Sequence, residues 1–172
     1  LVDALPGTPD DWLFEVKFDG YRLLARIDSR EIRLITRNGH DWTSKLPHLT
    51  KGLTSLKLKP GWLDGEIVVP GARSGTSFQE LQNAFESART RDIVLYLFDI
   101  PYYDGYDLTR VPLSERRALL ESLLGKGAPP ILFSQTFDTS PDDLLKSACQ
   151  LGLRRWPQRR SRSSTCTCRS CR

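Results

Sequence analysis

The sequence predicts an α+β fold in which antiparallel sheets are flanked by helices. Apolar runs of strand length recur between residues 12 and 100, and Asp-Gly and Asn-Gly pairs, which favour tight turns, lie beside several of them. Elsewhere the apolar residues are spaced as on one face of a helix. A chain of 172 residues, 39% of them hydrophobic and 27% charged, is long enough for one domain with a buried core.

Three strands are expected near the beginning of the chain. Residues 12–17 and 21–28 have the apolar pattern of strands, and the Asp19-Gly20 pair between them predicts a hairpin. Residues 32–37 form a third candidate strand, which ends at another turn pair, Asn38-Gly39. Short connections of this kind predict an antiparallel sheet.

Two further strands and three helices are expected beyond residue 60. Residues 62–69 and 93–100 predict strands, and the second is so continuously apolar that we expect it at the centre of the sheet. Residues 77–89 predict a helix that begins with a capping box. A second helix is expected over residues 112–124, where a glycine follows as the C-cap, and a third over residues 140–151, after a Ser-Pro start.

The chain changes character after residue 153. Residues 154–172 contain seven arginines, no acidic residue and no periodic apolar pattern, so we expect a disordered basic tail. Residues 1–153, the predicted domain, then carry 18 basic residues against 21 acidic ones, and the pI near 9.0 comes from the tail. Three tail cysteines resemble part of a zinc site, but without a histidine or a fourth thiol the set is incomplete.

Membrane insertion and secretion are not expected. The chain has no apolar run of about 18 residues, which a membrane-spanning helix requires. The first eleven residues hold three acids and no base, unlike a secretory leader. We therefore expect a cytoplasmic protein.

Lys17 is the candidate nucleophile. It stands at the end of an apolar strand and is followed by a turn and by Arg22. Desolvation and a neighbouring positive charge both favour the neutral amine, which is the nucleophilic form of lysine. From these residues alone, an ordinary surface lysine beside a hairpin remains the simpler interpretation.

Further motifs favour the interpretation of Lys17 as a nucleophile. Residues 17–22 read Lys-x-Asp-Gly-x-Arg, which resembles the first motif of the covalent nucleotidyltransferases, the superfamily of ATP-dependent DNA ligases, RNA ligases and capping enzymes. Four more segments resemble that superfamily's motifs in the same order: Thr36-Arg37-Asn38-Gly39, Leu63-Asp64-Gly65-Glu66, Tyr96-Leu97-Phe98-Asp99-Ile100 and Tyr103-Asp104-Gly105. Three segments narrow the resemblance to bacterial end-joining DNA ligases: residues 38–43, the helix over residues 78–85 and residues 112–117. RNA ligases and capping enzymes share the Lys17 motif, but residues 38–43 and 112–117 look like those of bacterial DNA ligases.

The resemblance implies an ATP-grasp-like adenylation fold and a reaction in three steps. Lys17 would attack the α-phosphate of ATP, releasing pyrophosphate and leaving a lysyl-AMP. The AMP would move to the 5′-phosphate of a nick, and the 3′-hydroxyl would displace it. The implied cofactors are ATP and Mg²⁺ or Mn²⁺, and the implied partners are nicked or broken double-stranded DNA and end-binding repair proteins, with the protein acting as a monomer.

The resemblance also implies roles for single residues. Arg22 would contact the ribose or phosphates of the nucleotide, and Arg37 a nucleotide or DNA phosphate. Glu66 would hold the ribose hydroxyl and help to place the metal ion. Two interpretations stay open for Phe98, which is either the surface on which adenine stacks or a plain core residue. Two also stay open for Glu15, which lies either at the adenine edge or outward on its strand.

The sequence departs from the family after residue 151. There the family continues with Glu-Gly, a strand and a later Lys-x-Lys, whereas this chain reads Gly152-Leu153-Arg154-Arg155. Arg-Arg can be encoded by CGA-AGG, which reads Glu-Gly after a shift of one nucleotide, so we expect the tail to be a frameshift product. The alternative is a genuine basic tail that binds DNA phosphates. Losing these motifs leaves the fold truncated, and the second function to consider is a catalytically dead nucleotide- or DNA-binding remnant of a ligase.

Overall fold

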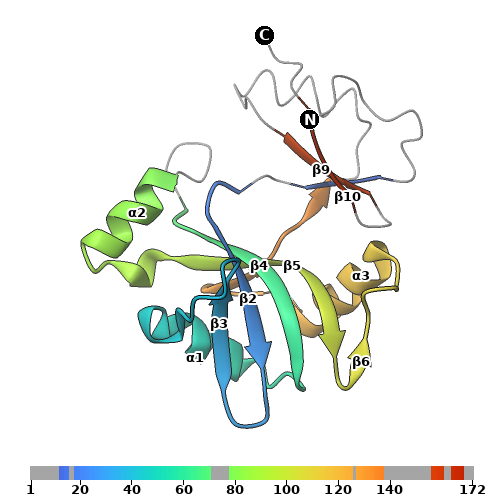
Figure 1. The fold of residues 1–172 in the computed structure, drawn as a ribbon, viewed down its shortest axis with the longest axis horizontal. Coiled ribbons are helices and arrows are strands. Elements are labelled where there is room, and N and C mark those ends of the chain that lie inside the picture. The colour runs from blue at the N-terminus through green and yellow to red at the C-terminus, as the bar shows by residue number, and fades with distance from the viewer. Residues whose placement is uncertain are drawn as a thin grey trace. The chain divides into compact units, whose positions relative to one another are not determined.

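The structure, a computed structural model, describes residues 12–15, 18–70, 78–125, 127–137, 156–160 and 164–168. The chain divides into two compact units (Figure 1). The larger comprises residues 18–111 and 115–133, and the smaller comprises residues 1–17, 112–114 and 134–172. Lys17 and the helix expected over residues 140–151 lie outside the described residues.

The larger unit is built on a six-stranded sheet with the order β3-β2-β4-β5-β6, in which β7 also pairs with β5. All pairs are antiparallel except β5 with β7. Its elements are β2 (Tyr21–Ile27), β3 (Ile32–Thr36), α1 (Pro47–Ser55), β4 (Gly61–Val68), α2 (Phe78–Glu86), the short helix η3 (Thr90–Asp92), β5 (Val94–Tyr103), β6 (Tyr106–Asp107), most of α3 (Leu113–Leu124) and β7 (Ile131–Phe133). The predicted α+β class is confirmed, and the apolar strand β5 has partners on both sides, as its sequence predicts.

The smaller unit contains a four-stranded sheet with the order β10-β9-β1-β8. Its strands are β1 (Trp12–Glu15), β8 (Thr136–Phe137), β9 (Trp156–Arg160) and β10 (Ser164–Cys168). The sequence predicts no regular structure after residue 153, whereas the structure pairs β9 with both β1 and β10. Strand pairing satisfies backbone groups whatever the side-chain pattern, which is why a tail without periodicity can contain strands.

The hairpin predicted at Asp19-Gly20 is wrong. The strand before it, β1, pairs with β8 and β9, and the strand after it, β2, pairs with β3 and β4. A Cβ atom at Gly20 would lie 2.0 Å from the carbonyl oxygen of Ile67, so this glycine permits a close approach to the backbone of β4. An Asp-Gly pair suits both uses, and the sequence alone does not distinguish them.

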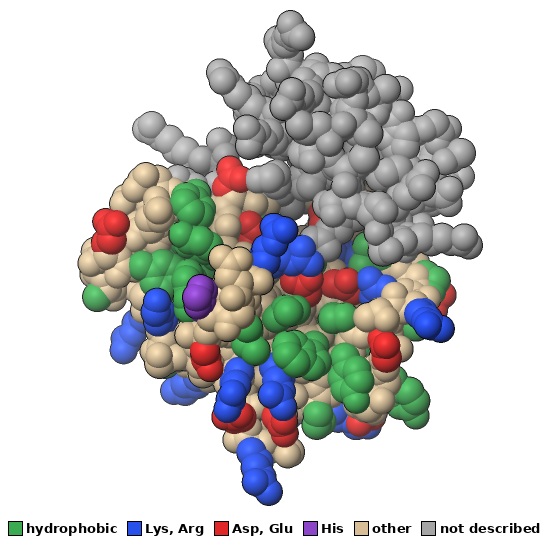
Figure 2. Space-filling model, viewed as in Figure 1, with side chains coloured by type: hydrophobic (Ala, Val, Ile, Leu, Met, Phe, Trp, Pro, Cys, Tyr) green, Lys and Arg blue, Asp and Glu red, His purple; other side chains and the backbone are tan. Residues whose placement is uncertain are grey.

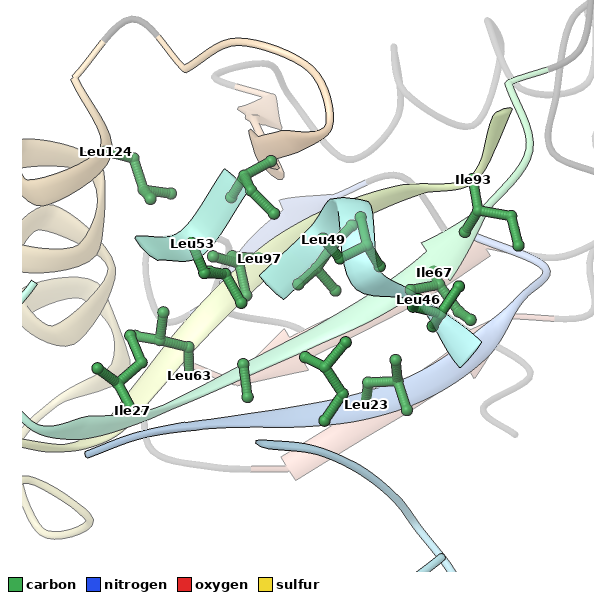
Figure 3. Packing of buried hydrophobic residues seen from close by; sticks show 14 of the residues in the cluster. Leu23, Ile27, Leu46, Leu49, Leu53, Leu63, Ile67, Ile93, Leu97 and Leu124 are labelled. Atoms are coloured by element: carbon green, nitrogen blue, oxygen red, sulfur yellow. The ribbon is translucent and has the colours of Figure 1, made fainter. Parts of the chain in front are cut away.

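The core of the larger unit lies between the sheet and α1. Alternate residues of each strand point to opposite faces of a sheet, and the inward ones are fully buried. Figure 3 shows Leu49 and Leu53 of α1 directed toward Leu63, Ile67 and Leu97 of β4 and β5. The sequence analysis did not predict α1, although Pro47 stands at the first turn, where proline commonly begins a helix.

Close packing of β4 against β5 depends on Gly65, because a Cβ atom there would lie 2.5 Å from the carbonyl oxygen of Tyr96. We expect Gly65→Ala to lower the free energy of unfolding by about 2–3 kcal/mol, since the β5 backbone would have to shift. The measurement is urea unfolding followed by circular dichroism.

Gly105→Ala is the matched control for this prediction. Gly105 has a φ of +87° and nothing within 4 Å of an added Cβ, so only conformational strain is introduced. We expect a loss of about 1 kcal/mol. A Gly65→Ala variant no less stable than Gly105→Ala would contradict the steric explanation.

Candidate functional site

The candidate site lies on the sheet face opposite α1. In the strand register, Arg22 of β2 is opposite Glu66 of β4, and Glu66 is opposite Tyr96 of β5. Side chains at paired positions lie on the same face, so these three form a row across three strands. In Figure 2, basic and acidic side chains lie side by side over the region where Figure 1 draws β2, β4 and β5.

Arg22 is held by Asp64. Its Nε donates to Asp64 Oδ1 at 2.9 Å, and its Nη2 donates to Oδ2. The Asp64 side chain is 8% exposed, whereas that of Arg22 is 52% exposed. The hydrogen bond to Asp64, together with the negative charges of Asp64, Asp99 and Glu66, raises the pKa of Arg22 above its ordinary value. The guanidinium is therefore a permanent cation, oriented by two bonds and still open to a ligand.

Glu66 holds the segment that follows Lys17. The backbone N–H of Gly20 donates to Glu66 Oε1 at 2.8 Å. Because Gly20 also lies against the β4 backbone, this residue is held to β4 at two points. Gly20 is the third residue after the candidate nucleophile, so β4 determines where the chain enters β2.

Aromatic rings accompany the charged row. Phe98 is 3% exposed, and the Arg22 guanidinium carbon lies 5.6 Å from its ring centroid. The rings of Phe18 and Tyr96 are stacked with centroids 4.3 Å apart and an interplanar angle of 21°. The sequence analysis missed Phe18 and Tyr96, although Tyr96 and Phe98, two residues apart on one strand, had to share a face.

A second ion pair supports the first. Arg116 of α3 donates from Nε to Asp99 Oδ1 at 2.7 Å and from Nη2 to Oδ2 at 2.8 Å, and both side chains are largely buried. Asp99 is the register partner of Asp64, so each of two opposed carboxylates has its own guanidinium. The next residue, Arg117, donates to the carbonyl oxygen of Phe98 at 2.8 Å. The sequence analysis assigned no role to these two arginines, although residues 112–117 contributed to the resemblance.

Two predicted site residues, Arg37 and Glu15, are not part of this row. Arg37 is exposed in the turn after β3 and forms no ion pair with a residue that the structure describes. Glu15 belongs to β1 in the smaller unit, and its side chain is 5% exposed, so it does not point outward into solvent. The role predicted for each remains a prediction.

The described residues contain no cluster of three histidine, cysteine or acidic side chains that could hold a metal ion. Asp64 and Asp99 each engage a guanidinium through both oxygens, and Glu66 Oε1 accepts from Gly20. Mg²⁺ often takes only one or two carboxylates when a phosphate ligand supplies further oxygens. A metal ion that arrives with phosphates would therefore need only one of these carboxylates, and the metal role predicted for Glu66 remains a prediction. No described helix has the length and hydropathy to cross a membrane.

Comparisons with known sequences agree on one family. The model of the ATP dependent DNA ligase domain matches residues 3–151. The chain is 54% identical over 154 residues to the multifunctional non-homologous end joining protein LigD of Pseudomonas aeruginosa, covering 89% of this chain and 18% of that protein. It is 36% identical over 152 residues to a DNA ligase of Natronomonas pharaonis, covering 82% of this chain and 27% of that one. The chain spans less than a third of the length of either relative.

Solved structures show the same likeness. The ligase domain of LigD from M. tuberculosis matches with a TM-score of 0.72 and 30% identity, covering 91% of this chain and 50% of that one. A mycobacterial DNA ligase D complexed with ATP and MES matches with a TM-score of 0.71 and 29% identity, covering 98% of this chain and 56% of that one.

The pairing of Asp99 with Arg116 leads to a stability prediction. We expect Arg116→Met to lower the free energy of unfolding by about 3–5 kcal/mol, because it leaves the Asp99 carboxylate buried without its cation. The double variant Asp99→Leu with Arg116→Met should recover much of that loss. Urea unfolding of the single and double variants measures both effects.

Arg33→Met serves as the control, since Arg33 pairs with Glu31 at the surface, where both side chains are about half exposed. Its expected cost is below about 1 kcal/mol. Equal losses in Arg116→Met and Arg33→Met would show that burial does not set the strength of the Asp99 pair.

Proposed function

We propose, from the premise that this chain belongs to the ATP-dependent DNA ligase family, that it forms a lysyl-AMP at Lys17 and passes the AMP to the 5′-phosphate of a DNA break. Two observations carry the proposal. Arg22, Glu66 and Tyr96 form a row across three strands, and Glu66 accepts a hydrogen bond from Gly20, the third residue after Lys17. A nucleophile, an oriented cation and an aromatic surface are what a nucleotide with a reactive phosphate requires.

In the first step, the neutral Lys17 amine attacks the α-phosphorus of ATP. A P–N bond forms, the bond between the α- and β-phosphates breaks, pyrophosphate leaves and the amine loses a proton to solvent. Arg22 supplies positive charge to the phosphates, while Asp64 keeps its guanidinium oriented. A bound Mg²⁺ would neutralise phosphate charge during this displacement.

In the remaining two steps, the attacking groups are supplied by the DNA. An oxygen of the 5′-phosphate attacks the AMP phosphorus, which breaks the P–N bond and restores Lys17. The 3′-hydroxyl then attacks the 5′-phosphorus, joins the strand and releases AMP. Because one relative is named a non-homologous end joining protein, we propose broken double-stranded DNA as the substrate and end-binding repair proteins as partners.

The nucleotide base has two candidate surfaces. Phe98 stands at the position that the resemblance assigns to adenine stacking. The Phe98 side chain is buried, however, and the Arg22 guanidinium lies near its ring. Tyr96 is partly exposed and stacks on Phe18, in line with Glu66. We propose that adenine lies beside these rings, with Glu66 accepting a hydrogen bond from the ribose hydroxyl.

A second candidate function is nucleotide binding without bond formation. It is favoured by residues 152–157, which lack the Glu-Gly segment of the family. In that case residues 1–153 would be an adenylation domain that holds its substrate but stabilises the α-phosphate too weakly to react.

Incubation with α-labelled ATP and Mg²⁺ separates the two functions. We expect acid-labile label on the wild-type chain, none on Lys17→Ala, and full labelling of the control Lys57→Gln, which changes an exposed lysine outside the site. Label retained by Lys17→Ala would rule out this nucleophile. A folded wild-type chain that binds ATP but takes no label would establish the non-catalytic function.

Glu66 variants test how the segment after Lys17 is held. Glu66→Gln keeps an oxygen that can accept from Gly20 but loses the charge, whereas Glu66→Ala loses both. We expect the labelling rate to fall by about tenfold in Glu66→Gln and by about 100-fold in Glu66→Ala. Equal losses in both variants would contradict a role through the Gly20 hydrogen bond.

A further inference from the structure

A basic groove lies beside α1, away from the row of Arg22, Glu66 and Tyr96. Two cavities of about 600 and 780 Å³ adjoin there and share His48, Lys51 and Arg91. The groove runs between α1 and η3, and all its lining residues belong to the larger unit. Because α1 covers the sheet face opposite the candidate active site, the α1–η3 groove is a separate place on the molecule.

The charge of the α1–η3 groove is not balanced within the described part of the chain. Lys51, Arg89 and Arg91 are exposed along it, and Asp92 is the acid beside them. Five other basic residues of the larger unit each pair with a carboxylate: Arg22, Arg26, Arg33, Lys59 and Arg116. Among described residues, none of the three groove cations has such a partner, so their positive potential extends to solvent.

The wall of the groove strengthens that potential. Leu56, Val94 and Ile131 form an apolar side with the two prolines that precede Ile131. A cleft with charges of one sign and walls of low polarisability concentrates the field and raises the local concentration of counter-ions. The groove can therefore attract an anion more strongly than an open surface with the same charges.

His48 adds an unsatisfied polar atom at the same place. Its Nε2 lies 2.8 Å from the carbonyl oxygen of Ile93 and donates to it, which leaves Nδ1 as the other polar atom of the ring. That Nδ1 is buried and has no hydrogen-bond partner among the described residues. The positive charge of the groove therefore comes from Lys51, Arg89 and Arg91 and not from this ring.

We infer that the α1–η3 groove binds phosphate groups, at a second site separate from lysyl-AMP formation. Arginine guanidinium groups donate paired hydrogen bonds that match phosphate oxygens, and lysine adds a point charge. The phosphate comes either from the backbone of duplex DNA or from a nucleotide, and the two sources differ in the number of contacts they make. Binding here does not depend on the proposed reaction of Lys17.

The test compares two double variants with the same change of charge. Lys51→Gln with Arg91→Gln removes two groove cations, and Arg30→Gln with Arg110→Gln removes two exposed arginines from turns elsewhere in the larger unit. The probes are a nicked DNA duplex at several salt concentrations and inorganic pyrophosphate by calorimetry. For DNA, we expect the groove variant to bind at least about tenfold more weakly than the control variant, with the slope of log K against log salt reduced by about 2.

Each outcome decides between the sources or against the inference. Weaker duplex binding by the groove variant assigns the site to DNA, and weaker pyrophosphate binding with unchanged duplex binding assigns it to a nucleotide. Equal binding of both probes by the groove and control variants overturns the inference. Labelling with α-labelled ATP, run on the same proteins, should be equal in both variants, so a failure of the proposed adenylation would appear there and leave the binding comparison intact.

Discussion

The opposition of two carboxylates on the central strands is the constraint on which the rest of the site depends. Asp64 and Asp99 are register partners on β4 and β5, and both side chains are shielded from water. Two such charges repel unless each is matched by a cation. Arg22 of β2 pairs with Asp64, and Arg116 of α3 pairs with Asp99. These ion pairs bind both β2 and α3 to the pair of strands β4 and β5.

This arrangement gives the sheet two different faces. Alternation along β2, β4 and β5 sends apolar side chains toward α1 and leaves a charged row on the other face. Glu66 then fastens the chain at Gly20 to that row. The core and the charged row therefore lie on opposite faces of the same strands, and the α1–η3 groove is on the packed side.

Prediction from sequence succeeded where local pattern alone determines structure. The strands β2 to β5, the helices α2 and α3 and the family resemblance followed from periodicity and ordered motifs, and the structure and the comparisons confirm them. The hairpin at Gly20 failed because the pair that permits a tight turn also permits close contact with a neighbouring strand. Helix α1 was missed because its apolar residues lie in a segment rich in threonine and glycine, which weakens the helical pattern.

The sequence by itself determined the strand and helix periods, the family and the residue types of the row, since these depend on neighbours along the chain. Only the tertiary structure decided which charges pair, that Phe98 is buried and that Tyr96 stacks on Phe18. The ion pair of Arg116 with Asp99 joins residues 17 positions apart, and that of Arg22 with Asp64 joins residues 42 apart. Such contacts depend on strand register and helix packing, which no local pattern encodes.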